Sequence, residues 1–245
     1  MVQAQLLSHQ SAHYHSNIAD MVPIHMGIAR QSSAFLSDKQ SDDYIALKSK
    51  ILTRDDHTCQ CCGFRSEKYQ ELLNISEGPS PKDEDIITTC LFCYQCFYLD
   101  EVSRMRSGIL LWLPEIEQAD LNHIARALYV ARISQGPMAD TSKKILDTLM
   151  TRRADVRERL GTDDPGVLSK VLSDYISRKR YAERDKRLDG VRVFPLDRRI
   201  IKEQDLEFNQ FPQILAYWRS KDGPFSGKIP NNWIDLYKNV EQNSK

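Results

Sequence analysis

The sequence predicts an α+β protein in which a small zinc-binding module precedes a larger, mainly helical region. Two observations predict this class. All six cysteines lie between Cys59 and Cys96, in two clusters next to short apolar runs of strand length. Most of the later residues follow the 3.6-residue repeat of amphipathic helices. We therefore expect an N-terminal extension at 1–40, a zinc-binding module at 41–113 and a helical region at 114–245.

The composition fits a protein with a real hydrophobic core and no general attraction to nucleic acid. The chain has 245 residues, of which 41% are hydrophobic, and 34 basic residues balance 34 acidic ones. No apolar run reaches the roughly 18 residues of a membrane span. The polar first 20 residues do not resemble a secretory signal. We therefore expect a cytoplasmic protein whose thiols stay reduced.

The first cysteine cluster has the spacing of a metal-binding knuckle. Cys59 and Cys62 form a C-x-x-C pair, which places two sulfur atoms on one tight turn. Gly63 suits this turn, because backbone N–H groups there can face the thiolates. Cys61 lies between the paired residues, and we expect it to point away from the metal.

The second cluster offers two possible pairs, Cys90 with Cys93 or Cys93 with Cys96. The strand-like run Asp85–Thr89 leads directly into Cys90, which favours the first pair. Cys96 then follows one helical turn later as a buried thiol or a substitute ligand. We expect one structural zinc ion held by four thiolates, those of Cys59, Cys62, Cys90 and Cys93.

Two other interpretations of the cysteines remain open. Six reduced core cysteines are conceivable, because free cysteine is often buried, but the paired spacing argues against this. A redox C-x-x-C motif usually lies near a βαβ pattern, which is absent here. A zinc ion with four cysteine ligands has no open coordination position, so we expect a structural and not a catalytic site.

Several elements can be placed from periodicity and from turn signals. A helix is expected from Ser41 to about Arg54, with Tyr44, Leu47, Lys48 and Ile51 along one face. A buried strand is expected at 108–113, ended by Pro114. A helix is expected at 118–135, with Gln118 to Asp120 as its cap and Gly136-Pro137 as its stop. A second is expected at 141–160, with Ile145, Leu149, Val156 and Leu160 facing inward. Further helices are expected at 167–187, 214–218 and 233–240, and extended chain at 191–195.

The knuckle region resembles the zinc-stabilised ββα-metal core of HNH endonucleases. The resemblance rests on Arg54-Asp55-x-x-Thr58-Cys59-x-x-Cys62-Gly63 and on Ile86-Ile-Thr-Thr-Cys90-x-x-Cys93. In such enzymes, a histidine between the knuckles activates water, and further histidine or asparagine residues hold the catalytic metal.

The catalytic residues of that enzyme class are missing from this sequence. No histidine occurs between His57 and His123, and His57 precedes the first knuckle. The expected position of the base contains Glu71 and Asn74, and neither replaces an imidazole near neutral pH. Tyr94 stands after the second knuckle, where many members have histidine. We therefore expect a scaffold without enzymatic activity.

A closer resemblance is to the DotN (IcmJ) family of Dot/Icm-type IVB secretion systems. It is good from about Tyr44 to Ile133 and weaker up to about Arg199. The stretches that carry it are Thr58-Cys59-Gln60-x-Cys62-Gly63-Phe64, Cys90-x-Phe92-Cys93-x-Gln95-Cys96-Phe97, Gly108-Ile-Leu-Leu-Trp-Leu-Pro-Glu115 and Gln118-Ala-Asp-Leu-Asn122.

This resemblance implies a non-enzymatic subunit of the type IV coupling complex. Family members resemble degenerate HNH-type zinc proteins that bind the C-terminal extension of the DotL-like coupling ATPase. They act on the cytoplasmic side of the inner membrane, where with other coupling-complex subunits they gather adaptors that recruit effector substrates. The alternative is an HNH-like nucleic-acid-binding protein or nuclease.

Four other features receive structural interpretations. The basic run Arg178-Lys179-Arg180 is interrupted downstream by acidic residues, which favours a solvated helix face over a nucleic-acid or lipid contact. His123 is expected to be a structural core histidine. His9, His13 and His15 are expected to lie in a mobile tail. The aromatic residues Trp112, Tyr129, Phe194, Trp218 and Trp233 are expected mainly in the core.

Overall fold

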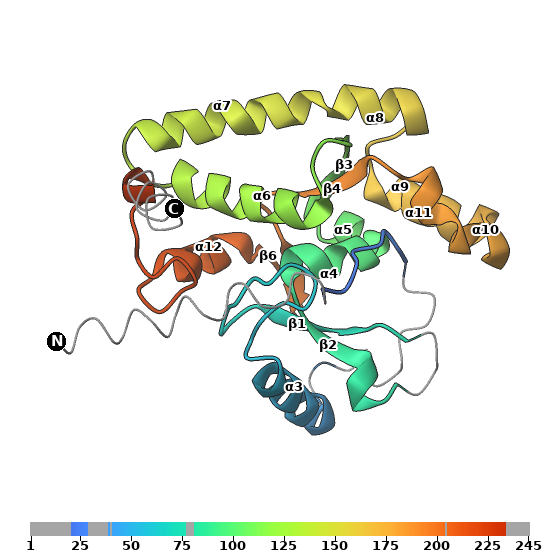
Figure 1. Cartoon of the computed structure of the whole chain (residues 1–245), viewed down its shortest axis with the longest axis horizontal. Coiled ribbons are helices and arrows are strands. Elements are labelled where there is room, and N and C mark those ends of the chain that lie inside the picture. Colours follow the sequence, from blue (N-terminus) through green and yellow to red (C-terminus); the bar gives the residue numbers. More distant parts are fainter. Residues whose placement is uncertain (1–20, 29–38, 40, 77–80, 204, 234–245) are drawn as a thin grey trace, which may run out of the picture.

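The computed structural model describes residues 21–28, 39, 41–76, 81–203 and 205–233. In this part of the chain the structure is mixed α+β and mostly helical, with three two-stranded antiparallel sheets (Figure 1). The predicted fold class is therefore confirmed. The histidines of the first 20 residues and most of the helix expected at 233–240 lie outside the described residues.

A helix, a hairpin and a second helix form the cysteine-rich part of the molecule. Their bounds are α3 (Asp42–Arg54), β1 (Gln70–Asn74), the short 3₁₀ helix η2 (Asp83–Asp85), β2 (Ile86–Cys90) and α4 (Leu91–Phe97). The Ser41 hydroxyl accepts a hydrogen bond from the backbone N–H of Tyr44 and starts α3 as predicted. In the hairpin, Gln70 pairs with Cys90 and Leu72 with Thr88.

Helix α3 covers one face of this hairpin. Tyr44 and Ile51 of the helix are buried in a small apolar cluster with Leu72 and Ile86 of the two strands. At its other end, Arg54 donates a 2.7 Å hydrogen bond to the backbone carbonyl of Ile86. The β1–β2–α4 order matches the ββα arrangement implied by the resemblance to HNH endonucleases, although the sequence analysis placed only the second strand, at Asp85–Thr89.

A second sheet joins segments that lie about eighty residues apart in the sequence. Its strands are β3 (Gly108–Trp112) and β4 (Val191–Pro195), and helices α5 (Leu99–Arg104) and α6 (Gln118–Arg132) adjoin it. Both strands were expected. Tyr129 of α6 donates a 2.7 Å hydrogen bond to the carbonyl of Pro195 and anchors the helix on β4.

The predicted cap and stop of α6 are wrong. The N-cap is Glu117. Gln118 cannot cap the helix, because its amide group bonds to both the N–H and the carbonyl of Val193 in β4. The helix ends at Arg132, and Gly136, with a φ of +103°, precedes Pro137 at the start of the next helix.

The helix expected at 141–160 starts earlier and is interrupted. It consists of α7 (Pro137–Thr151) and α8 (Arg153–Leu160), which form one long rod across the top of Figure 1. At the junction, the backbone carbonyl of Arg152 accepts a hydrogen bond from the N–H of Trp112 at the end of β3. Leu149 and Val156 are buried as predicted, whereas Ile145 is 40% exposed and Leu146 takes its place inward.

The single helix expected at 167–187 is wrong, because the structure breaks it into pieces. These are α9 (Pro165–Lys170), the π-helical turn η3 (Val171–Tyr175), α10 (Arg178–Ala182) and α11 (Arg184–Arg187). Ile176 is extended, and the Ser177 hydroxyl accepts a hydrogen bond from the N–H of Arg180 as a new N-cap. A capping serine inside the pattern therefore ended one helix and started another.

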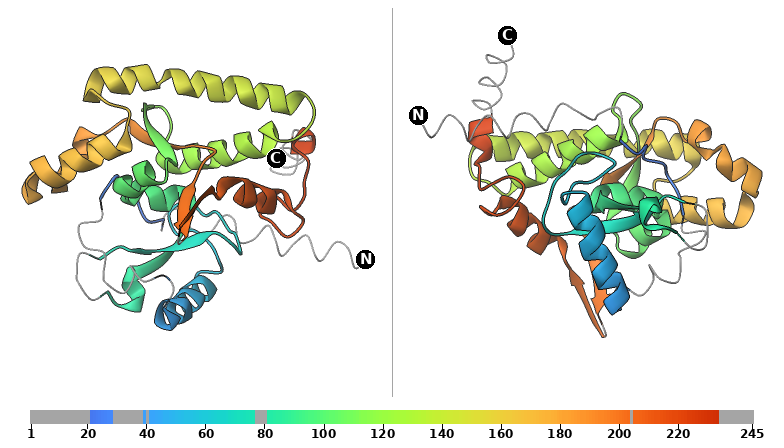
Figure 2. Two further views of the ribbon diagram at one scale, coloured as in Figure 1. Left: turned by 180° about the vertical axis from the view of Figure 1, so that it is seen from behind. Right: turned by 60° about the horizontal axis from the view of Figure 1, so that its bottom comes forward.

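The last part of the described chain contains a hairpin that the sequence analysis missed. Strands β5 (Ile200–Glu203) and β6 (Leu206–Asn209) extend away from the body of the molecule (Figure 2). Helix α12 (Phe211–Arg219) includes the expected helix at 214–218, and the short 3₁₀ helix η4 (Pro230–Asn232) follows. Among the expected aromatic core residues, Tyr129, Phe194 and Trp218 are buried.

One apolar core joins the cysteine clusters to the helical region. It contains five of the six buried cysteines, residues of α6 such as Leu121, and Phe211 and Trp218 of α12, whereas Cys96 belongs to the second core. A second core lies under α5, β3, β4 and α9. The division at residue 113 remains a prediction. Within the described residues, no helix combines the length and the apolar character needed to cross a bilayer.

Gly190, directly before β4, provides a test of this packing. A Cβ atom there would lie 2.7 Å from the ring of Trp112, whereas at Gly161 nothing lies within 4 Å, although both residues have left-handed φ values of +80° and +75°. We expect Gly161→Ala to cost about 1–2 kcal/mol of unfolding free energy from backbone strain alone. Gly190→Ala should cost about 1–3 kcal/mol more, because the core is overpacked. Denaturant unfolding measures the unfolding free energy of both variants. Equal losses of unfolding free energy in the two variants would contradict the packing of Gly190 against Trp112.

Candidate metal centre

The first knuckle is a tight turn closed by its own backbone. The N–H of Cys59 donates to the carbonyl of Phe64 at 3.0 Å, and the N–H of Gly63 donates to the carbonyl of Cys59 at 2.8 Å. Gly63 has a φ of +71°, a left-handed conformation that glycine adopts without strain. The N–H of Gln60 donates to the carbonyl of Thr88, which ties this turn to β2.

The second knuckle lies where β2 becomes α4. Cys90 is the last residue of β2 and the N-cap of α4, and its sulfur atom accepts a hydrogen bond from the N–H of Cys93 at 3.4 Å. The strand therefore delivers one sulfur atom and the first turn of the helix delivers the other. The expected strand-to-turn geometry of this pair is observed.

The four sulfur atoms of the two predicted pairs lie together. Those of Cys59, Cys62, Cys90 and Cys93 are all within 4.8 Å of one another, and each residue is at most 5% exposed. The Cys62 and Cys90 sulfur atoms are 3.8 Å apart. A tetrahedral site with metal–sulfur bonds of about 2.3 Å has sulfur atoms about 3.8 Å apart. The donor set and its spacing therefore fit one metal ion.

The two remaining cysteines lie outside this group. The Cys96 thiol donates to the carbonyl of Phe92 at 3.3 Å, one turn back in α4, and burial raises its pKa well above the ordinary value. Cys61 is buried as well, and interaction with Cys59 raises the pKa of its thiol. Neither Cys61 nor Cys96 belongs to the four cysteines whose sulfur atoms lie within 4.8 Å of one another.

Helix α6 approaches the cysteine group with three polar side chains. Asn122 donates to the sulfur of Cys93 at 3.3 Å, and Arg126 donates to the sulfur of Cys90 at 2.6 Å. His123 lies between them, with its Nε2 atom 2.7 Å from the carbonyl oxygen of Cys62. Each of these contacts joins the helical region to the turns that carry the sulfur atoms.

Aromatic rings surround the guanidinium group of Arg126. Its central carbon lies 4.1 Å from the centre of the Phe64 ring and 5.1 Å from that of Phe92. Both rings make edge-to-face contacts with Trp218 of α12, at 5.8 and 5.5 Å. The metal centre is therefore closed off from water by aromatic residues of three segments that are distant in the sequence.

The charges in this cluster favour thiolates. A hydrogen bond with Cys59 acts to raise the pKa of Cys62, but the hydrogen bonds from the other two sulfur atoms and the charge of Arg126 outweigh it and lower the pKa to about 5. Burial acts to lower the pKa of Arg126, but the thiolates, that of Cys90 first, raise it above its usual value. The arginine therefore stays charged beside sulfur atoms that lose their protons readily.

The sequence analysis missed the role of α6. It treated His123 as a core histidine and did not single out Asn122 or Arg126 as functional residues. A signal was present, because Asn122 and Arg126 lie four residues apart and therefore on one helix face, among apolar residues such as Leu121 and Ala125. A buried polar pair on an otherwise apolar face indicates a specific partner.

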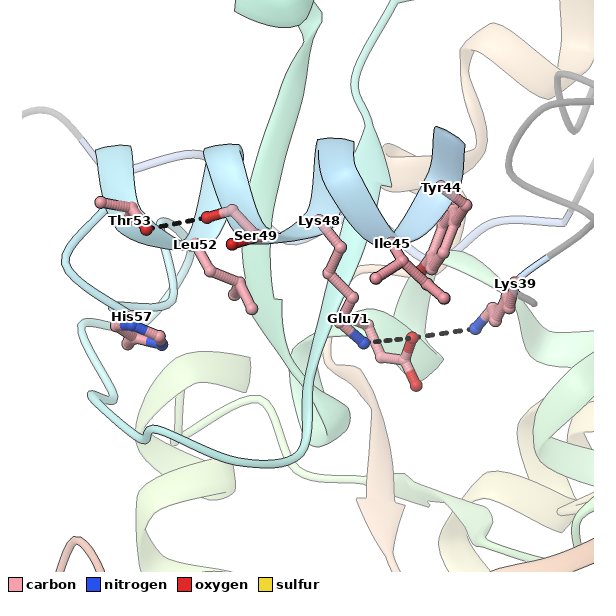
Figure 3. A pocket seen from close by; sticks show the side chains of 9 residues that line it. All are labelled: Lys39, Tyr44, Ile45, Lys48, Ser49, Leu52, Thr53, His57 and Glu71. Carbon is pink, nitrogen blue, oxygen red and sulfur yellow. Dashed lines mark hydrogen bonds and ion pairs between the residues drawn. The ribbon is translucent and has the colours of Figure 1, made fainter. Parts of the chain in front are cut away.

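The position at which an HNH enzyme would place its base contains an ion-pair cluster. The Glu71 carboxylate lies 2.9 Å from Lys39 and 4.0 Å from Lys48 (Figure 3). It also lies 3.4 Å from Arg199. Burial acts to raise the pKa of Glu71, but these cations, Lys39 first, lower it. Glu71 lines a cavity of 570 Å³ that also reaches Tyr44 and His57.

Asn74, which also lies where the base is expected, and Tyr94, which stands where many HNH enzymes have histidine, make local contacts. The amide oxygen of Asn74 accepts hydrogen bonds from both the N–H and the hydroxyl of Ser76, at 2.9 Å each, and so closes the turn after β1. Tyr94 is 7% exposed, and the ammonium group of Lys39 lies 5.0 Å from its ring centre. The Asn74 side chain therefore stabilises a turn, and the Tyr94 ring packs against Lys39.

Fold and site together define a mixed α+β protein with a buried group of four cysteines whose spacing fits one metal ion. The chain is a homologue of the type 4 apparatus protein DotN of Legionella pneumophila subsp. pneumophila strain Philadelphia 1, to which it is 28% identical over 162 residues. This similarity covers 64% of the chain and 75% of that protein. No protein-family model matches the sequence.

Cysteine-to-serine variants test which sulfur atoms hold the metal. We expect the purified protein to contain one metal ion per chain, and Cys93→Ser to lose most of it because one of four ligands is gone. Cys96→Ser is the matched control, since it changes a buried thiol in the same helix outside the group of four, and it should keep the metal. Elemental analysis of both variants and of the wild type measures this. Loss of the metal from Cys96→Ser as well as from Cys93→Ser would contradict the assignment of Cys90 with Cys93 and would favour the pair Cys93 with Cys96.

Proposed function

We propose that this chain is a non-enzymatic, zinc-stabilised scaffold subunit of a type IV secretion apparatus. In this role it binds the C-terminal extension of a DotL-like coupling ATPase and helps to recruit effector substrates with other coupling-complex subunits. The protein then works in the cytoplasm at the inner membrane, held there by its partners. The similarity to DotN, which extends over 75% of that protein, is the observation that carries the proposal.

Zinc is the metal that the donor set favours. Four thiolates in tetrahedral spacing are typical of structural zinc sites, and such a set leaves no open position for a reacting water molecule. A bound zinc ion would link the two knuckles to each other. Zinc has no redox chemistry, so its role would be structural. Since structural zinc contributes about 10 kcal/mol or more to the folding of small domains, the cysteine-rich segment would depend on it.

The state of Glu71 supports the absence of nuclease activity. A general base must reach its substrate with a free lone pair and a pKa near the working pH. The carboxylate of Glu71 instead contacts three cations, and its pKa is lowered. Its ion pairs join β1 to Lys39, to α3 and to the chain before β5, which is a structural role.

Binding to the coupling ATPase is the direct test of the scaffold role. Zinc-loaded full-length protein should form a complex of defined stoichiometry with a peptide from the C-terminal extension of the coupling ATPase of the same host. Calorimetry measures the affinity, and a peptide of the same composition in scrambled order is the control. The same ATPase should also co-purify with the tagged chain from its host.

The alternative function predicts a different result. An HNH-like nucleic-acid-binding protein would ignore the peptide and bind duplex DNA with a steep salt dependence. That binding would be lost when Arg178, Lys179 and Arg180 are changed together to glutamate. Salt-dependent DNA binding without any peptide complex would overturn the scaffold proposal.

Replacement of Glu71 separates a structural role from a catalytic one. We expect no metal-dependent DNA cleavage by the wild type, and Glu71→Gln should lower the unfolding free energy at pH 7 by about 2 kcal/mol. Because the folded-state pKa of Glu71 is lowered, its contribution is present above the unfolded pKa of about 4.3 and is lost as the pH falls through the folded value. The stability difference between the two proteins should therefore shrink in acid. Cleavage that Glu71→Gln abolishes would contradict the proposal.

A further inference from the structure

Arg126 is an unusual residue for a protein interior. It is 1% exposed, and within the described residues it forms no ion pair with a carboxylate. Its Nη2 atom lies 2.6 Å from the sulfur of Cys90 and 3.8 Å from that of Cys62. Its Nε atom has no hydrogen-bond partner in the structure. The sulfur atoms are therefore the negative groups that offset a fully buried positive charge.

The charge of the metal centre explains why a cation is needed there. Four thiolates carry four negative charges and a divalent ion carries two positive ones, so the filled site has a net charge of minus two. Burying such a net charge in a medium of low dielectric constant costs several kcal/mol unless it is compensated. One guanidinium ion in contact with two of the sulfur atoms halves the net charge.

The groups around the Arg126 side chain stabilise its positive charge. The rings of Phe64 and Phe92 lie 4.1 and 5.1 Å from the guanidinium carbon, which stabilises a positive charge through their negatively polarised faces. The imidazole Nδ1 of His123 lies 3.4 Å from Nη1. The side chain is therefore fixed between aromatic rings and sulfur atoms with little freedom to move.

We propose that Arg126 is the counter-cation of the four-cysteine metal centre, and that the affinity of this centre for a divalent metal depends on the positive charge at residue 126. Asn122 differs in this respect, because it offers one neutral hydrogen bond to Cys93. The proposal concerns the metal centre alone and does not depend on the secretion role. It also explains why α6 carries a charged residue on its buried face.

Three substitutions separate charge from bulk and from hydrogen bonding. Arg126→Lys keeps the charge, Arg126→Met keeps most of the bulk without the charge, and Arg126→Gln keeps donor groups without the charge. Arg132→Met is the matched control, because Arg132 lies on the same helix and pairs with Asp197 away from the metal. Zinc affinity is measured in the full-length protein by competition with a chelator of known affinity.

We expect Arg126→Met and Arg126→Gln to bind zinc roughly ten- to a hundredfold more weakly than the wild type. Arg126→Lys should stay much closer to the wild type, and Arg132→Met should equal it. The absorption spectrum of the cobalt-substituted proteins, which reports on the four thiolates, should keep its shape in every variant. An unchanged spectrum would show that the same four thiolates bind the metal in every variant and that only the affinity for the metal differs.

Other outcomes overturn the proposal. If Arg126→Met binds zinc as tightly as the wild type while Arg126→Lys does not, the residue acts through packing. If Arg126→Gln is as tight as the wild type, hydrogen bonding suffices and the charge is irrelevant. Should Arg126→Met fail to fold, the comparison of Gln with Lys gives the same decision. Equal affinities throughout the series would also contradict the proposal.

Discussion

The contact between helix α6 and the group of four cysteines, through the sulfur atoms of Cys62, Cys90 and Cys93, is the interaction on which the rest of the structure depends. The two knuckles are separated by the whole β1–β2 hairpin, and their sulfur atoms meet only because the hairpin folds back on itself. Helix α6 then closes the open side of this group with Asn122 and Arg126. Because α6 also rests on β4 and faces α12, the position of the metal centre determines where the helical region lies.

The sequence predicts the metal centre better than its surroundings. Cysteine spacing indicates a shared metal site because the two ligands of a knuckle are close in the sequence. Cys59 with Cys62, and Cys90 with Cys93, each form a C-x-x-C pair within four residues. The groups that contact the sulfur atoms come from a helix thirty residues further along. Their spacing shows only that Asn122 and Arg126 share a buried face, and tertiary packing decides what they meet there.

The same distinction between local and distant interactions explains the errors in the helical region. Periodicity predicts two helices, at 141–160 and 167–187, and most residues of both ranges are helical, but neither range forms one continuous helix. The breaks depend on single groups: the carbonyl of Arg152 that bonds to Trp112, and the Ser177 side chain that caps α10. The capping serine could have been recognised from the sequence, whereas the bond to Trp112 could not, because it needs a strand forty residues away. Strands β5 and β6 were missed because each has only four residues.

The Glu71 cluster supports the proposal that this chain is not an enzyme. A catalytic carboxylate or imidazole needs space, a tuned pKa and access to substrate. Here a single carboxylate joins four segments of the chain through Lys39, Lys48 and Arg199. Such a cluster contributes to stability only while its members remain paired, so a group that must exchange protons with a substrate is incompatible with it.

The segment 21–28 connects the two cysteine knuckles to helices α10 and α11 through hydrogen bonds. At one end, the N–H of Val22 bonds to the carbonyl of Gln60 inside the first knuckle. Towards the other end, Gly27 exchanges hydrogen bonds with Cys96 and Leu99, next to the second knuckle. The carbonyl of the adjacent Met26 accepts a 2.7 Å hydrogen bond from Arg184 of α11. The helices α10 and α11 are therefore held against the cysteine-rich part of the chain by a segment that both knuckles position, so the shape of this surface is tied to the integrity of the metal centre.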